Sequence, residues 1–199
     1  MNDAELNRLY ERLYFHELDA RDKIHARLQV PLTVLLAIVG AVVFLFQNFD
    51  YQPRLWSAPR VAFAFFFVSG TVILVIAAIW FVKALYNNAY YFLPDSKKTA
   101  EYKLLLQKTY EPYENKNQLV SEALERYIRD YYVEYAAFNT QVNDRRSAYI
   151  HLCNGALVAA ALLFVFAYLL FYFGDLDKGR LRTEVFIAKP IEVKILDRK

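Results

Sequence analysis

The chain has a single cysteine, Cys153, among its 199 residues, together with only five glycines and six prolines. One cysteine cannot build a disulfide framework, and so few glycines and prolines exclude a collagen-like or low-complexity chain. Charge is missing altogether from three long runs, although 23% of all residues are charged. The charged and the apolar residues are therefore segregated along the chain, whereas a soluble domain interleaves them.

Apolar residues are in excess, since 57% of the chain is hydrophobic against about 45–50% in typical globular proteins. The charge-free runs cover residues 30–49, 61–82 and 147–174. A bilayer core of about 30 Å is crossed by roughly 20 helical residues. We therefore predict an all-α membrane protein with three transmembrane helices, at 30–49, 61–82 and 150–174. Three buried core helices of a soluble protein are the weaker alternative, because too little chain remains to cover them.

The basic residues predict an orientation in the membrane. Residues 1–29 contain five Lys and Arg, and the short connector 50–60 contains two, which places the N-terminus in the cytoplasm. Acidic residues precede the first apolar run, so it is an anchor rather than a cleaved signal peptide. Three spans then place the connector 83–146 inside and the tail 175–199 outside, although basic residues soon after the third span oppose that placement of the tail.

The segments outside the spans are predicted to form a helical cytoplasmic layer. The arm 1–29 has the pattern of an amphipathic helix and opens with a capping-box spacing, Asn2 to Glu5. The connector 83–146 is expected to contain a short helix over 96–110 and the start of a second helix that continues into the third span. The tail 175–199 is rich in β-branched residues and predicts a short strand-like segment.

Aromatic side chains gather in and around this connector, where 11 of the 16 tyrosines lie between residues 86 and 149. Helical spacing places three of these tyrosines and one phenylalanine on one stripe: Tyr127, Tyr131, Tyr135 and Phe138. The stripe is either part of the core or a contact surface for a partner. The aromatic residues directly after the second span, Tyr86 and Tyr90 to Phe92, are interpreted as an aromatic belt at the membrane interface.

Two further sets of residues are candidate sites. Small residues share a helix face in two spans, Ala37 with Ala41 and Gly155 with Ala159; they serve helix packing within one chain or between copies in a homo-oligomer. A polar set follows the spacing i, i+4, i+7 before the third span: Asn139, Asn143 and Arg146. These either hydrogen-bond to the N-terminal arm at the membrane boundary or form a latch that a partner releases.

The sequence carries no pattern typical of catalysis. Residues 16–20 begin like a zinc-protease helix but lack the second histidine, and no glycine-rich phosphate loop occurs. No ionisable residue lies in the middle of a span, which argues against a charge-coupled transporter. We therefore expect no enzyme, no cofactor, no metal site and no small-molecule substrate.

Two stretches suggest a family: ELDARDKIHARLQVPLTVLL, which runs into the first span, and FNTQVNDRRSAYIHLCNGALVAAALL, which runs into the last. The layout resembles the small membrane effectors of bacterial anti-phage systems, in particular the retron-associated transmembrane effectors. The resemblance implies a multi-pass toxin of the bacterial inner membrane, held inactive by a reverse transcriptase with its RNA–DNA product. Release on infection would disrupt the membrane and abort the infection. The alternative is a non-toxic membrane scaffold or accessory subunit that recruits a protein partner.

Overall fold

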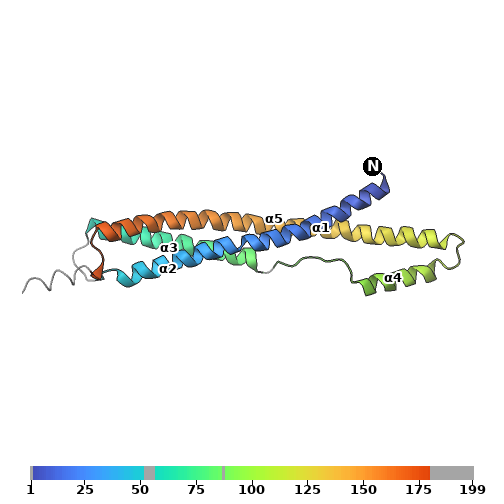
Figure 1. Cartoon of the computed structure of the whole chain (residues 1–199), viewed down its shortest axis with the longest axis horizontal. Helices are drawn as coiled ribbons and strands as arrows, with labels where there is room; N and C mark the ends of the chain where they lie inside the picture. The colour runs from blue at the N-terminus through green and yellow to red at the C-terminus, as the bar shows by residue number, and fades with distance from the viewer. Residues whose placement is uncertain (1, 52–56, 87, 180–199) are drawn as a thin grey trace, which may run out of the picture. The chain divides into compact units, whose positions relative to one another are not determined.

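The computed structural model describes residues 2–51, 57–86 and 88–179 (Figure 1). Within these ranges the elements are α1 (Asp3–Arg27), α2 (Gln29–Asn48), α3 (Ala58–Leu85), α4 (Ser96–Thr109) and α5 (Lys116–Phe173). The described residues contain no strand, only an isolated antiparallel bridge between Phe49 and Asp177, so the all-α prediction is confirmed. The strand-like part of the tail lies outside the described residues from 180 onwards.

Local signals determine where α1 begins and ends. Asn2 is its N-cap: the Asn2 side chain accepts a hydrogen bond from the Glu5 amide at 2.8 Å, and the Glu5 carboxylate accepts one from the Asn2 amide at 3.0 Å. This is the capping box that the spacing predicts. Pro31 has no amide hydrogen to continue the ladder, and the interruption falls at Leu28, so that Pro31 lies in the first turn of α2.

Three helical stretches are long and apolar enough to cross a membrane: Asp3–Asn48, Ala58–Leu85 and Lys116–Phe173. Only 22% to 28% of the residues in the most apolar part of each stretch are buried. Large side chains such as Leu36, Phe65 and Val158 are 60% or more exposed. An outward apolar surface of this kind is stable in lipid and not in water, which confirms the prediction of a membrane protein with three transmembrane helices.

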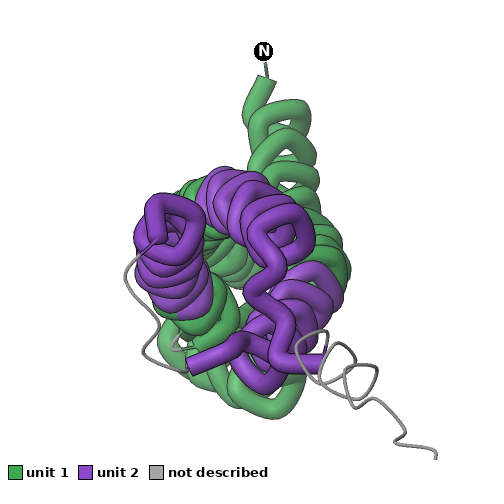
Figure 2. The backbone as a smooth tube through the Cα atoms, turned by 90° about the vertical axis from the view of Figure 1, so that its left-hand side faces the viewer, with its two compact units in different colours: residues 1–31, 79–153 green, residues 32–78, 154–199 purple. Residues whose placement is uncertain are grey.

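The chain divides into two compact units, shown in two colours in Figure 2. Unit 1 contains residues 1–31 and 79–153, and unit 2 contains residues 32–78 and 154–199. Helices α3 and α5 each contribute residues to both units. In unit 2 every charged residue that the structure describes lies between 50 and 60 or between 175 and 178, so this unit contains most of the uncharged length of the spans.

Unit 2 is a bundle of three helical segments with an aromatic core. The buried Phe171 ring lies 6.2 Å from that of Phe63 and 6.4 Å from that of Phe44. The buried Phe164 ring lies 5.9 Å from that of Phe67. Gly70 allows close packing here, because a Cβ added to it would meet the Phe164 ring at 3.1 Å. These contacts connect α2 with α5 and α3 with α5.

One end of unit 2 is closed by polar contacts. The Arg60 guanidinium donates to the Asp50 carboxylate at 2.9 Å, and the two side chains are 17% and 7% exposed. The Asp50 amide donates to the Leu176 carbonyl at 2.9 Å. The connector after α2 is thereby joined both to the start of α3 and to the residues that follow α5.

Unit 1 consists of helices arranged along the first part of α5. The Tyr14 ring of α1 lies 5.6 Å from Tyr132, and the Tyr102 ring of α4 stacks on Tyr127 at 4.1 Å. An apolar cluster closer to the spans contains Ile24, Leu28, Ala84 and Ile150. The arm, α4 and the first part of α5 form the helical layer that the sequence predicts.

Candidate functional site

The polar set predicted before the third span is buried. Asn139, Asn143 and Arg146 lie on one face of α5 and are 0%, 4% and 4% exposed. Polar side chains are this completely buried only where hydrogen bonds replace those to water. Their partners come from α1, from the end of α3 and from the segment between α3 and α4. We call this group the polar clasp; its members are Glu17, Tyr90, Tyr91, Asn139, Asn143 and Arg146.

Asn139 pairs with one backbone position. Its Oδ1 accepts a hydrogen bond from the Tyr91 amide and its Nδ2 donates to the Tyr91 carbonyl, both at 3.0 Å. The Asn139 side chain thus satisfies both backbone groups of Tyr91. In an extended segment these bonds would otherwise have to come from a neighbouring strand. An aspartate or a leucine in its place cannot make both bonds at neutral pH.

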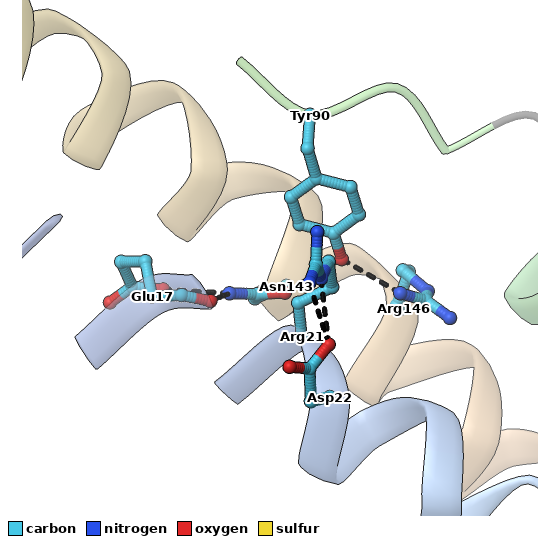
Figure 3. A network of polar contacts seen from close by, with 6 residues as sticks. All are labelled: Glu17, Arg21, Asp22, Tyr90, Asn143 and Arg146. Carbon is cyan, nitrogen blue, oxygen red and sulfur yellow. Dashed lines mark hydrogen bonds and ion pairs between the residues drawn. The ribbon is translucent and has the colours of Figure 1, made fainter. Parts of the chain in front are cut away.

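Asn143 joins two other elements to α5. Its Oδ1 accepts a hydrogen bond from the Tyr90 hydroxyl at 2.7 Å, and its Nδ2 donates to the Glu17 backbone carbonyl and to Glu17 Oε2, each at 2.8 Å. Figure 3 shows this side chain between Glu17 of α1 and Tyr90. The hydrogen bond between Asn143 and the N-terminal arm is the contact that the sequence predicts for this face of α5.

Arg146 binds the end of α3. Its Nε donates to the Ala84 carbonyl at 3.0 Å, and its Nη1 donates to the Tyr90 hydroxyl at 2.8 Å. Ala84 lies in the last turn of α3, where backbone carbonyls have no partner within the helix. The Asn88 amide donates to the same carbonyl at 3.1 Å. Arg146 therefore caps one helix while it is anchored in another.

The tyrosine stripe of α5 is covered by other parts of the same unit. The Tyr91 ring stacks on Phe138 with ring centres 4.1 Å apart, and it lies 5.2 Å from the Tyr135 ring. The hydroxyl of Tyr14, which is 2% exposed, accepts a hydrogen bond from the Leu93 amide at 3.1 Å. This part of the stripe is packed against the segment between α3 and α4, as the core interpretation expects.

The other part of the stripe contacts α4. Tyr127 stacks on Tyr102, and its ring centre lies 4.8 Å from that of Tyr131. A hydrogen bond with Tyr131, with burial as the next cause, raises the pKa of Tyr127 to about 12. Burial raises the pKa of Tyr135 as well. The contact between α4 and α5 is thus made by stacked rings, beside tyrosine hydroxyls of α5 that stay neutral at physiological pH.

The small residues singled out in the spans lie mainly on the outside of unit 2. Ala37, Ala41 and Gly155 are exposed, and Ala159 is half-buried. A Cβ added to Gly155 would meet no atom within 4 Å. Ala160, by contrast, is 0% exposed on the same helix. Packing within unit 2 therefore uses the neighbouring alanine and leaves the face of Gly155 open.

Sequence reasoning missed several members of the clasp. It assigned Tyr90 and Tyr91 to an aromatic belt, and it did not single out Glu17. It also did not point to Ala84, whose carbonyl accepts a hydrogen bond from Arg146. The hydrogen bonds of the clasp join residues 48 to 126 positions apart, and no local pattern encodes such pairs. The sequence offered one signal for the clasp: two asparagines and an arginine lie on a face of α5 that is otherwise apolar.

No family model, no curated protein and no solved structure matches the chain. Among the described residues, no three His, Cys, Asp or Glu side chains lie together in an arrangement that could hold a metal ion. The function is therefore argued from the clasp, the exposed faces of the spans and the charge distribution.

Proposed function

We propose that the chain is a multi-pass effector of the bacterial inner membrane that disrupts this membrane when it is released from an inhibitory partner. Its topology has the N-terminal arm and the connector in the cytoplasm and crosses the membrane three times. The basic residues of the arm, five against two in the connector 50–60, support this orientation. The resemblance to retron-associated effectors supports the biological role, which is abortive infection under control of a reverse transcriptase and its RNA–DNA product.

One observation carries the proposal: small residues stand open on the lipid-facing surface of unit 2. A Cβ at Gly40 or Gly155 would meet nothing within 4 Å, and Ala37 and Ala41 are exposed on the same helix as Gly40. Small residues let helix backbones approach closely, and in a membrane this packing drives association. Such faces suit a second copy of the chain, and assembly of copies is a route to membrane damage.

The clasp supplies the resting state in this proposal. It connects α1, the end of α3 and α5 through buried hydrogen bonds from Asn139, Asn143 and Arg146. Buried polar networks specify one arrangement of helices, and breaking one partner leaves the others unsatisfied. In this proposal the inhibitory partner keeps the arm on α5, and separation of the arm after its release would change the packing of all three helices together.

A scaffold or accessory subunit is the second candidate, and a different surface favours it. Leu104 and Leu105 of α4 are 59% and 58% exposed in the charged unit 1, outside the predicted spans. A pair of exposed leucines on a soluble helix suits contact with a protein partner. The tyrosine stripe is a less suitable surface, because α4 and Tyr91 already cover it.

Expression in bacteria, with a dye that reports membrane potential, separates the two candidates. The effector depolarises cells when produced alone, and co-production of the reverse transcriptase and its RNA–DNA product suppresses this effect. Gly155→Leu should abolish depolarisation, because it fills the small-residue face at a position where an added Cβ meets no atom within 4 Å. Val158→Leu is the matched control, since Val158 is 62% exposed on the same helix and already large.

Unchanged membrane potential at high expression would refute the effector hypothesis and leave the scaffold hypothesis. Equal loss of activity in Gly155→Leu and Val158→Leu would refute the role of the small-residue face. Under the scaffold hypothesis, Leu104→Glu should release a co-purified protein while the membrane potential stays normal throughout.

A further inference from the structure

Arg146 is a buried cation without a carboxylate partner. It is 4% exposed, and among the described residues no Asp or Glu oxygen lies within 4.0 Å of its guanidinium. Two of the five N–H groups of a guanidinium are used, on Ala84 and Tyr90. A buried charge is stable only when it is paired and hydrogen-bonded. The remaining donors therefore call for an anion.

A cavity of about 250 Å³ lies beside this guanidinium. The residues that line it are Arg21, Asp22, His25, Leu85, Asn88, Tyr90 and Arg146, all of which belong to unit 1. Its volume is below the roughly 300–1,000 Å³ of pockets for larger ligands, but it exceeds the ~30 Å³ of one water several times. A small anionic group fits this space better than a nucleotide or a drug-sized molecule.

The second cation of the cavity is already oriented. Arg21 donates through Nε to Asp22 Oδ1 at 2.9 Å, and its guanidinium carbon lies 5.8 Å from the centre of the Tyr90 ring. Figure 3 shows Arg21 and Arg146 reaching Tyr90 from different helices. Two guanidinium groups with an amide and an imidazole beside them form the donor set that phosphate oxygens prefer.

The predicted ends of the spans place the cavity at the depth of lipid headgroups. Arg146 precedes the predicted third span by four residues, His25 precedes the first by five, and Leu85 follows the second by three. At about 1.5 Å per residue, these positions lie roughly 5–8 Å beyond the hydrocarbon core, which is the thickness of the headgroup layer on one side. Basic pockets between helices on the cytoplasmic side are known to suit anionic headgroups.

We propose that this cavity binds a phosphate group, supplied by the headgroup of an anionic phospholipid of the inner leaflet. The phosphate lies between Arg146 and Arg21, with Asn88 and His25 as further donors. Its charge neutralises the buried guanidinium, so that the lipid stabilises the junction of α1, α3 and α5. The site goes beyond the proposed effector function, because a scaffold in the same membrane would bind the headgroup equally.

Asp22 opposes the ligand and supplies a sharp test. Its carboxylate lines the cavity and competes with phosphate for Arg21. Because the Asp22 side chain is 68% exposed, Asp22→Asn should leave the fold intact and strengthen phosphate binding. If Asp22 served only to hold Arg21 in place, Asp22→Asn would give the opposite result and weaken phosphate binding.

The experiment measures lipid bound to the purified full chain by native mass spectrometry. Phosphatidylglycerol and phosphatidylcholine are compared, with glycerol phosphate as the soluble source of the same group. Arg21→Gln should weaken phosphatidylglycerol binding about tenfold or more, as the loss of a charge-assisted hydrogen bond implies. Lys23→Gln is the matched control, because Lys23 is an exposed cation on the same helix that does not line the cavity.

Each outcome decides the proposal. Preference for phosphatidylglycerol that needs Arg21 and survives Lys23→Gln supports the headgroup site. Binding of glycerol phosphate alone, with the same dependence on Arg21, supports the phosphate site with a soluble ligand. Equal binding of the two lipids, or equal losses in Arg21→Gln and Lys23→Gln, would overturn it. Arg146→Gln extends the test where circular dichroism shows the helices intact.

Discussion

Replacing Asn139 by aspartate tests the clasp at its most buried member. Asn139 is 0% exposed, and its amide pairs with both the N–H and the C=O of Tyr91. Asn139→Asp keeps the size and one acceptor but loses the amide donor. A protonated aspartic acid can still donate to the Tyr91 carbonyl, whereas an ionised one places a buried charge against that oxygen. The variant should therefore be nearly normal in acid and destabilised at neutral pH.

The size of the effect follows from the work of keeping the new carboxyl group protonated. Its pKa in the unfolded chain is about 3.9, and each pH unit above that value costs ~1.4 kcal/mol. At pH 7 this limits the loss of stability to about 4 kcal/mol, because a carboxylate whose burial would cost more than that takes up a proton instead. The folded pKa is raised, so stability is retained below about pH 4 and lost as the pH rises towards the folded pKa.

Hydrogen exchange followed by mass spectrometry measures this loss directly. Peptides covering residues 86–95 should exchange up to about 1,000-fold faster than wild type at pH 7 and at nearly the wild-type rate near pH 4. Asn117→Asp is the control, because Asn117 is exposed in the first turn of the same helix, and it should change stability by less than ~0.5 kcal/mol. A difference from wild type that does not vary with pH would refute the pairing with Tyr91.

Further predictions concern packing and titration. Gly70→Ala brings a Cβ to 3.1 Å from the Phe164 ring and should lower the free energy of unfolding by about 1–3 kcal/mol. Gly40→Ala is the control: its Cβ meets nothing within 4 Å, so it should keep or raise the melting temperature in detergent. Equal melting temperatures of the two variants would contradict the close packing at Gly70. Ultraviolet titration should show a tyrosinate transition at about 12 that disappears in Tyr127→Phe and moves towards 10.0 in Tyr131→Phe. Because folding raises this pKa, Tyr127 should leave stability unchanged below pH 10 and reduce it between 10 and about 12; a transition at 10.0 in the wild type would contradict the hydrogen bond.

The secondary structure and the membrane class were predictable because both depend on local properties. Three charge-free runs of sufficient length predict spans whatever surrounds them, since hydropathy adds along a helix. The start of α1 follows from Asn2 and Glu5, and the end of α4 follows from the turn before Pro112. The continuous α5 follows from the lack of any helix-breaking residue between 117 and 173.

The clasp was predictable only in part. The spacing of Asn139, Asn143 and Arg146 predicts a shared face and contact with the arm, and Glu17 provides that contact. The choice of Tyr90 as the shared partner of Asn143 and Arg146 has no counterpart in the local sequence. It depends on where the extended segment after α3 crosses α5, which is a property of the packed helices.

Sequence alone therefore determined which residues are helical and which helices prefer lipid, because those preferences are set within a few turns of chain. Tertiary structure decided which of two equivalent small residues faces the interior: Ala160 is buried, whereas Gly155, five residues earlier, is open. It also decided that Arg146 is buried beside a cavity, with no Asp or Glu oxygen of the described residues within 4.0 Å of its guanidinium. Both outcomes depend on the rotation of each helix about its axis, and that angle is set only when the helices pack against one another.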